Sequence, residues 1–300
     1  MKKKTYLFAL MAMALTLGSC SDNENGIGGE TSKYITVSTS IGNMTRVATD
    51  ANGGQTFEEG DEISVYAWTG DATVAPETSE RVVNNAINKL TNGSWVSTPQ
   101  MLWKNNRDKH YFIGVYPTAA ISDLSAGEYT FDVNKQTESD LLVAVNKDGL
   151  SYNADAQQTV PLTFTHVMAK LAVNLTYKNQ WGGIPTVEKV VVGNAAKEAT
   201  INYLTKVVTP SATAKEDFSL PEITENTKYV SVIIPQEDVK QLTIVIGGKN
   251  FVYDNGTPFK LESGKITTVN LEVGRDEIKL GDVKITDWEN GSTFSGEALN

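Results

Sequence analysis

Hydrophobic and polar residues alternate along most of the chain after Tyr34. In the first such run, residues 34–41, Ile35, Val37 and Ile41 share one face and polar side chains dominate the other, which is typical of a half-buried strand. Similar runs lie at residues 62–68, 110–116, 140–145, 168–177, 187–192, 228–234, 241–246 and 265–273. Only residues 238–242 suggest a single helical turn. The pattern predicts an all-β chain.

A polar stretch at residues 151–158 divides this patterned part into two halves. About 260 residues follow residue 33, which is near the upper limit for one β-sandwich and comfortable for two of ~120 to 130 residues. Each half has enough short strands to enclose one dry interior. We therefore predict two tandem β-sandwich domains, residues 34–156 and 157–300.

The N-terminus carries a targeting signal. Residues 2–4 are lysines, residues 6–17 are apolar, and residues 17–20, Leu-Gly-Ser-Cys, have the pattern of a lipobox. The apolar run is too short to span a hydrocarbon core of ~30 Å as a helix. We therefore predict a lipoprotein signal peptide at residues 1–19, lipid on Cys20, and attachment to the membrane through that lipid alone.

Charge and composition limit the classes of partner and of binding site that the chain can have. The chain has 26 basic and 36 acidic side chains, and removal of residues 1–19 leaves 23 basic residues and a formal charge of −13. Such a surface repels phosphate backbones, so a nucleic-acid partner is not expected. Residues 20–33 are polar, acidic and Gly-rich, which predicts a flexible tether. The single cysteine excludes an intrachain disulfide and a cysteine-based zinc cluster.

Side chains suited to catalysis are scarce. His110 and His166 are the two histidines, both lie in strand-like runs, and neither has a neighbouring cysteine or Gly-x-Ser-x-Gly motif. We interpret His166 as a core or interface histidine. Acidic and amide residues recur at every second position of residues 132–140, but Thr137 and Val143 stand where a calcium loop needs Gly and Glu. No enzyme activity, cofactor or metal site is predicted.

Six segments occur in a characteristic order along the chain. They are Thr45-Arg46-Val47, residues 57–66, residues 102–103 with 111–117, residues 140–144, residues 162–171 and residues 261–271. Together they resemble the fimbrillins, the pilin-like lipoproteins that build type V pili. The resemblance implies two transthyretin-like β-sandwich domains and a lipidated precursor carried to the outer membrane. It also implies assembly with other fimbrillin subunits after an extracellular Arg-specific protease removes the N-terminal strand.

Residues 34–46 are the candidate segment for removal on maturation. The strand at 34–41 is followed by a polar loop in which Arg46 is the one basic residue and the candidate cleavage site. A sandwich that loses a strand has unpaired backbone groups beside exposed apolar side chains, and a neighbour's strand repairs both defects. The family usually has Ala after this arginine, whereas Val47 stands here. The alternative is an uncleaved surface arginine.

The C-terminal tail, residues 277–300, is the candidate donor segment. It contains two short alternating pieces joined at Gly281-Asp282, and its apolar side chains are expected to face one way: Ile278, Leu280, Val283 and Ile285. In the family such a segment is the natural donor to the adjacent subunit. The alternative is that the tail completes its own sandwich, as tip and accessory fimbrillins often do.

Two functions follow from these observations. The leading hypothesis is a stalk or tip subunit of a cell-surface pilus, assembled by strand exchange and serving adhesion to a host-surface ligand. The alternative is a monomeric surface lipoprotein that binds glycan or protein ligands through exposed aromatic residues, for which the five tryptophans are candidates. An enzyme ranks third, because no cluster of titratable groups is evident in the sequence.

Overall fold

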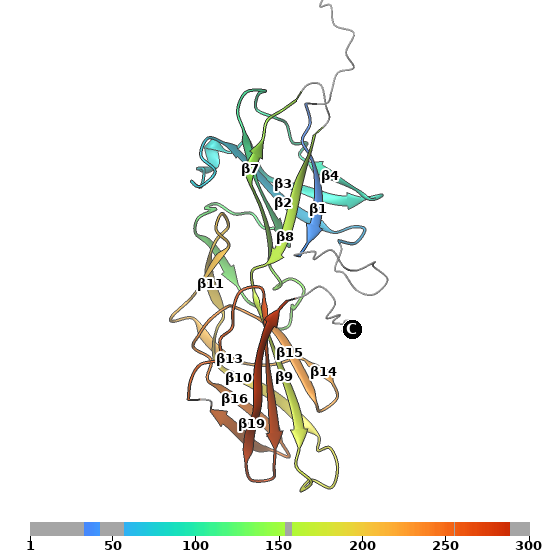
Figure 1. Cartoon of the computed structure of the whole chain (residues 1–300), viewed down its shortest axis with the longest axis vertical. Helices are drawn as coiled ribbons and strands as arrows, with labels where there is room; N and C mark the ends of the chain where they lie inside the picture. The colour runs from blue at the N-terminus through green and yellow to red at the C-terminus, as the bar shows by residue number, and fades with distance from the viewer. Residues whose placement is uncertain (1–32, 43–56, 154–157, 255, 289–300) are drawn as a thin grey trace, which may run out of the picture. The chain divides into compact units, whose positions relative to one another are not determined.

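β-strands make up nearly all the regular structure of the computed structural model, which describes residues 33–42, 57–153, 158–254 and 256–288 (Figure 1). Within those ranges the one other regular element is a single 3-10 turn, η1 (Thr78–Glu80). The described residues belong to one compact unit, residues 31–300. The all-β prediction is confirmed. The signal peptide 1–19, Cys20, the tether up to residue 32 and Arg46 lie outside the described residues.

The largest sheet has seven strands in the order β1-β8-β7-β5-β2-β3-β4. Their bounds are β1 (Thr36–Ile41), β2 (Glu62–Thr69), β3 (Val83–Thr91), β4 (Ser94–Thr98), β5 (His110–Tyr116), β7 (Leu142–Leu150) and β8 (Thr159–His166). The edge strand β1 runs parallel to β8, whereas the other neighbours are antiparallel. The two edges also approach each other, since Trp95 Nε1 of β4 donates a hydrogen bond to Thr39 Oγ1 of β1 at 3.0 Å.

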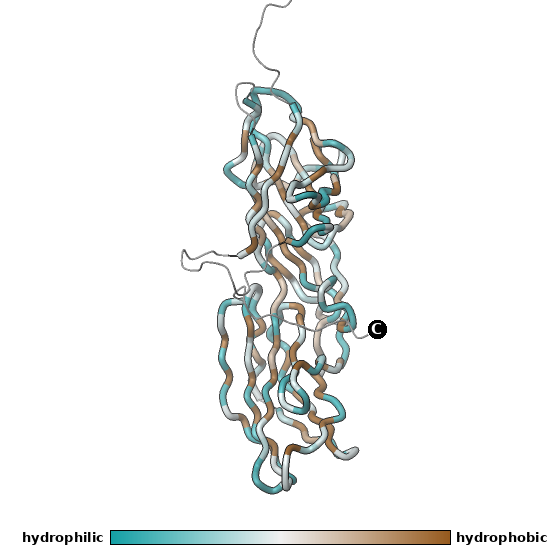
Figure 2. The backbone as a smooth tube through the Cα atoms, turned by 90° about the vertical axis from the view of Figure 1, so that its right-hand side faces the viewer, coloured by the Kyte–Doolittle hydropathy of each residue, from teal (hydrophilic) through white to brown (hydrophobic). Residues whose placement is uncertain are grey.

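Three further sheets complete the described fold. A five-stranded sheet has the order β14 (Glu222–Thr224), β15 (Lys228–Ile233), β9 (Ala169–Tyr177), β18 (Lys265–Val273), β19 (Ile278–Asp287). A four-stranded sheet has the order β13 (Lys215–Ser219), β10 (Val187–Ala196), β16 (Gln241–Ile246), β17 (Lys249–Asp254). A three-stranded sheet has the order β12 (Val207–Pro210), β11 (Glu198–Asn202), β6 (Gly127–Thr130). Hydrophobic positions recur along these strands and hydrophilic ones gather in the loops (Figure 2).

The central strands β2 and β5 of the seven-stranded sheet are buried on both faces. In β2, Val65 and Ala67 pack into a core shared with β1 and β8. Tyr66 and Trp68, on the opposite face, pack into a second core that also contains residues of β9 and β10. Burial on both faces explains why residues 63–68 are almost continuously apolar instead of alternating.

Contacts cross the predicted domain boundary at 156/157. Strand β8 follows the boundary in sequence but pairs with β1 and β7 of the seven-stranded sheet. Strand β6 precedes the boundary but pairs with β11. The division into domains 34–156 and 157–300 stays a prediction. It places β8 in the second domain, although β8 pairs with strands of the first.

The helical turn expected at residues 238–242 is wrong. Strand β16 begins at Gln241, and Leu242 lies opposite Tyr253 of β17. Val239 and Leu242 are both fully buried. Both side chains are buried because the chain enters strand β16 between them.

Candidate functional site

Strand β1 forms one edge of the seven-stranded sheet and buries one of its own faces in the core. Its segment buries Ile35, Val37 and Ile41, which are 2%, 6% and 9% exposed. The backbone is tied at both ends, because Ile35 N donates to Met101 O at 2.9 Å and Gly42 N donates to Phe164 O at 2.8 Å. The alternation seen in the sequence therefore corresponds to a strand with one face in the core.

Removal of β1 would uncover a hydrophobic groove along β8. The side chains beneath it are Val160, Leu162 and Phe164, each at most 1% exposed. Backbone groups of β8 that pair with β1 from Thr36 to Ile41 would lose their partners. Both losses are costly in water, so the groove requires a replacement strand. Cleavage at Arg46 itself stays a prediction, because that residue lies outside the described part.

The C-terminal strand β19 lies at the edge of the five-stranded sheet and pairs with β18 of its own chain. The four aliphatic residues predicted for donation lie opposite core positions of β18, in the pairs Ile278 with Val273, Leu280 with Leu271, Val283 with Val269 and Ile285 with Thr267. In an antiparallel ladder, residues directly opposite each other share a face. All four therefore share one face, and a register shift between Asn270 and Leu271 makes this spacing fit.

These side chains are only partly buried while β19 pairs with β18 of its own chain, an arrangement that we describe as the tail being at home. Leu280, Val283 and Ile285 are 37%, 39% and 39% exposed, whereas Val269 and Leu271 on the neighbouring strand are fully buried. Ion pairs fix the two ends of β19, from Lys178 to Glu277 and from Lys265 to Asp287. Such exposed pairs contribute little free energy. The strand is thus held at home mainly by ladder hydrogen bonds and partial burial.

Trp288, just after β19, sits in a buried cluster that we call the indole socket, defined by Asp140, His166 and Lys170. The imidazole of His166 stacks on the indole at 3.9 Å between ring centroids and 6° between planes. The Lys170 ammonium lies 3.9 Å from an indole ring centroid, and His166 Nδ1 pairs with Asp140 Oδ1 at 2.8 Å. Trp288, His166 and Lys170 are all less than a tenth exposed. The backbone of Trp288 is also fixed, since its N–H donates to Gly264 O at 2.9 Å.

Glycine is favoured at position 264 beneath this contact. Its φ is +67°, and a Cβ there would lie 3.1 Å from His166 O. The turn is anchored to the strand connection by Gly264 N donating to Met168 O at 2.8 Å. The turn at Gly264 therefore connects Trp288 to the segment between His166 and Lys170 through backbone hydrogen bonds.

The sequence indicated the indole socket only in part. His166 was expected to be a core or interface histidine, and it is buried. Lys170 was not singled out, although a lysine inside the apolar run at residues 167–175 is unusual enough to have marked the position. Trp288 was considered only as one of five candidates for sugar stacking.

Lys170 gives the indole socket a measurable titration. Burial lowers the pKa of Lys170 to about 8, while the Asp140 carboxylate acts in the opposite direction. In the unfolded chain a lysine titrates near ~10.4, so between the two values the unfolded chain binds a proton that the folded chain has released. The free energy of unfolding should therefore rise with pH across this window, by about 3 kcal/mol in full.

Denaturant unfolding of the native chain and of Lys170→Met from pH 7 to pH 10 measures this effect. The native chain is expected to gain stability relative to the variant as pH rises. Parallel pH profiles for the two proteins would show that Lys170 keeps its ordinary pKa.

Other clusters are occupied by structural bonds. His110 is buried, which lowers its pKa, and its Nε2 accepts a hydrogen bond from Lys104 N at 3.0 Å. In the stretch first compared with a calcium loop, Gln136 is bonded through its side chain to Ser231 and Val232, and Lys135 pairs with Glu138. Among the described residues no group of three or more His, Cys, Asp or Glu is placed to hold a metal ion.

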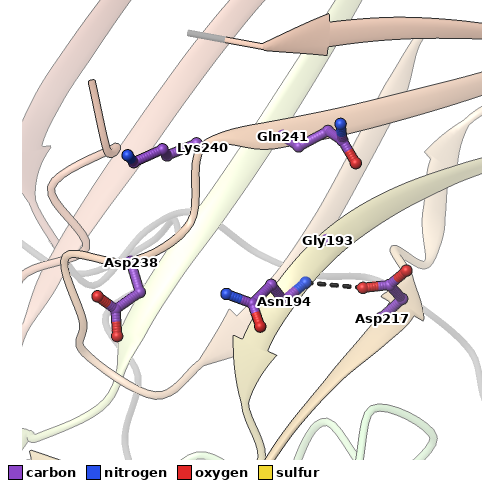
Figure 3. A pocket seen from close by; sticks show the side chains of 6 residues that line it. All are labelled: Gly193, Asn194, Asp217, Asp238, Lys240 and Gln241. Atoms are coloured by element: carbon purple, nitrogen blue, oxygen red, sulfur yellow. Dashed lines mark hydrogen bonds between the residues drawn. The ribbon is translucent and has the colours of Figure 1, made fainter. Parts of the chain in front are cut away.

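An open polar depression of about 440 Å³ lies over β10, β13 and the start of β16 (Figure 3). It is lined by Gly193, Asn194, Asp217, Asp238, Lys240 and Gln241. Asn194 N donates to Asp217 Oδ1 at 2.7 Å, and Asp238 pairs with Lys215 at 2.5 Å. Because its acidic groups are engaged and it contains no nucleophile paired with a base, the depression offers no catalytic arrangement.

The tryptophans do not form a sugar-stacking platform. All five are described, and none is exposed: Trp68, Trp103 and Trp288 are buried, and Trp95 and Trp181 are intermediate. Trp181 donates its Nε1 hydrogen bond to Val273 O at 2.9 Å and packs edge-on against Phe251. Glycan binding through exposed tryptophan faces is therefore not supported.

Comparison with known proteins identifies the family. The model of the fimbrillin-like family matches residues 45–288, which contain both β8 and β19. The chain belongs to the fimbrillin-like family. Over 99% of its length it is 25% identical to the whole of Fim1C, a candidate fimbrium subunit of Bacteroides uniformis.

Solved structures agree with the fimbrillin fold. A candidate cell adhesion protein of Bacteroides ovatus gives a TM-score of 0.64 at 18% identity, over 85% of this chain and 98% of that one. Another, from Bacteroides uniformis, gives 0.63 at 20% identity, over 86% and 100%. At these identities the likeness establishes the fold alone. Membership of the fimbrillin-like family supports a role in a cell-surface appendage.

No helix in the described part of the chain has the length and apolarity needed to cross a membrane.

Proposed function

We propose that this fimbrillin-like chain is a structural subunit, stalk or tip, of a cell-surface pilus that serves adhesion, and that it assembles by donor-strand exchange after proteolysis. The observation that carries the proposal is the position of β1. It is a short strand near the N-terminus, at a sheet edge, covering three almost fully buried core residues of β8. Arg46 follows β1 by five residues and is the proposed cleavage site.

Cleavage would change how β1 is held. Its three buried aliphatic residues, Ile35, Val37 and Ile41, contribute roughly 1.5 to 3 kcal/mol each. While the chain is intact, the strand stays at a high effective concentration beside its groove. After cleavage it becomes a separate peptide that a competing strand can displace.

The tail supplies that competing strand in our proposal. Ile278, Leu280, Val283 and Ile285 share a face that is incompletely covered at home. Complete burial of four fully exposed aliphatic side chains is worth roughly 6 to 12 kcal/mol before ordering costs, and exchange gains the part of this that the tail's own sheet leaves uncovered. The partners are then further fimbrillin subunits, with an Arg-specific extracellular protease for maturation and a host-surface ligand for adhesion. The two-domain organisation, 34–156 and 157–300, is part of the same proposal.

Protease treatment of the purified chain tests this function. After cleavage at Arg46, the proposal expects a ladder of multimers on a gel. The competing function, a monomeric surface lipoprotein that binds glycan or protein ligands, expects a cleaved but stable monomer with saturable ligand binding.

Lipid attachment at Cys20 forms the membrane-bound precursor in this proposal. Cys20→Ala is expected to abolish labelling by a fatty-acid analogue and to move the protein from the membrane to a soluble or unprocessed fraction. Ser19→Ala is a matched control, because alanine keeps the small residue that the lipobox needs. Unchanged labelling and fractionation of Cys20→Ala would contradict lipidation.

A further inference from the structure

The indole socket lies just beyond the end of the groove that β1 occupies. Strand β1 pairs with β8 in parallel as far as Ile41, which lies opposite Phe164. His166, the last residue of β8, is two residues further on. A strand that replaced β1 and continued in its direction would reach the level of His166 within three residues, since each residue adds about 3.3 Å.

The apolar spacing of β19 fits the places that the β1 segment vacates. The inward positions of that segment are Ile35, Val37, Thr39 and Ile41, and the candidates to replace them in order are Ile278, Leu280, Val283 and Ile285. The stretch from Ile278 to Ile285 is one residue longer than the stretch from Ile35 to Ile41. Strand β19 already accommodates one extra residue opposite Asn270 and Leu271. A bulge retained at Gly281 would let all four side chains face the groove. One contact changes, because Val283 cannot accept the Trp95 hydrogen bond that Thr39 accepts.

This register gives Trp288 a destination. With Ile285 opposite Phe164 in place of Ile41, Asp287 falls opposite His166. Trp288 follows directly, beyond the last residue of β8, where strand alternation no longer fixes which way its side chain faces. The acceptor's own Trp288 occupies that position while its tail is at home. When the acceptor's tail leaves to enter another subunit, its indole socket becomes free for the incoming tail.

We propose that the indole socket holds Trp288 of its own chain before assembly and receives Trp288 of a second copy afterwards. The inference rests on the strand exchange proposed above. An indole suits the site because a flat imidazole and an ammonium group both favour its π face. The ring nitrogen Nε2 of His166 is also buried with no hydrogen-bond partner in the structure, and unpaired buried polar atoms are uncommon.

A one-to-one complex of two full-length variants isolates the contact between Trp288 of the donor and the indole socket of the acceptor. The donor carries Arg46→Ala, so that its own β1 stays attached and it cannot accept a tail, and His166→Ala, so that its own Trp288 has no stacking partner before it donates. The acceptor carries Leu280→Asp and is cleaved before mixing. Its aspartate reaches water at home, where Leu280 is 37% exposed, but would be buried in place of Val37, which is 6% exposed. The acceptor therefore cannot donate, and the mixture stops at a pair.

Trp288→Ala is then placed in either partner, and the dissociation constant of the pair is measured. In the donor it should weaken the complex with a Trp288→Ala acceptor about tenfold, because the stacking and cation–π contacts in the vacant indole socket are lost. In the acceptor it should tighten the complex, because the indole socket is vacated for the incoming residue. In a His166→Ala acceptor, the donor substitution should lose most of its effect, as a double-mutant cycle requires. Trp288→Phe in the donor should give an intermediate affinity.

The results separate this inference from strand exchange itself. A complex that ignores the donor's Trp288, or that weakens when the acceptor's Trp288 is removed, overturns the inference and leaves exchange standing. Failure of the pair to form at all overturns both. Near-native circular dichroism of each variant before mixing establishes that a weakened complex reflects the lost contact.

The register has its own covalent test. Ser40 Oγ and Thr163 Oγ1 lie 3.2 Å apart across β1 and β8, and Lys284 would take the place of Ser40. Cysteines at Lys284 of the donor and Thr163 of the acceptor, in chains with Cys20→Ser, should form an intermolecular disulfide. Cysteines at Asp282 or Thr286 with Thr163 should not. Linkage through either of these two pairs overturns the placement of Trp288 at the indole socket.

Discussion

An Arg46→Ala chain is expected to remain monomeric after treatment with an arginine-specific protease, under conditions in which the native chain forms a ladder. The reason is the covalent link between β1 and the rest of the sheet. Ile35, Val37 and Ile41 keep their burial as long as the strand cannot diffuse away, so a competing tail gains nothing by entering. The loss of polymer should be nearly complete.

Arg107→Ala is the matched control, because Arg107 is also an exposed arginine but lies in the loop before β5. This variant should polymerise like the native chain. A ladder from Arg46→Ala, or loss of the ladder with Arg107→Ala, would show that the cleavage site lies elsewhere. Size-exclusion chromatography with mass analysis of the cleaved chains reports both size and cut position.

Deletion of residues 277–300 should abolish long polymers. The shortened chain loses β19 and Trp288 but keeps the groove, so after cleavage it should still accept a native tail and cap the end of a polymer. It should also be less stable, because fully buried Val269 and Leu271 would then lie on an edge strand. Long polymers from the deleted chain would make the donor assignment wrong.

If the deletion prevents folding, the substitution Leu280→Asp tests whether the tail is the donor. Its side chain is partly exposed at home, so the variant should fold, yet it should fail to donate. Lys284→Asp is the control, since Lys284 is exposed and lies on the opposite face of β19. It should still polymerise. Equal polymer yields from the two variants would contradict burial of Leu280 in a groove.

The strands with clear alternation or long apolar runs could be predicted from the sequence, because the local order of apolar and polar residues shows which side chains are buried. Residues 34–41 gave β1 almost to its ends, and residues 265–273 gave β18 with its bounds. The register shift in β19 falls at Gly281-Asp282, where the sequence suggested a break. In each case the local pattern and the final packing agree.

Features that depend on distant pairing could not be predicted in this way. β1 and β8 pair in parallel across about 120 residues, and no local pattern encodes that choice of partner. The alternation of Val160, Leu162 and Phe164 in β8 is present in the sequence, but β8 and β1 lie on opposite sides of the predicted domain boundary. The indole socket of Asp140, His166 and Lys170 receives Trp288 only after β8, β9 and β19 are in place.

Electron cryo-microscopy of the polymer formed by the native cleaved chain shows which strand fills the groove along β8. We predict that β1 is absent from each subunit and that residues 278–285 of a neighbour lie in its place, parallel to β8, with Ile285 opposite Phe164. Polymers in which every subunit retains β1 on β8 and its own β19 on β18 would contradict donor-strand exchange.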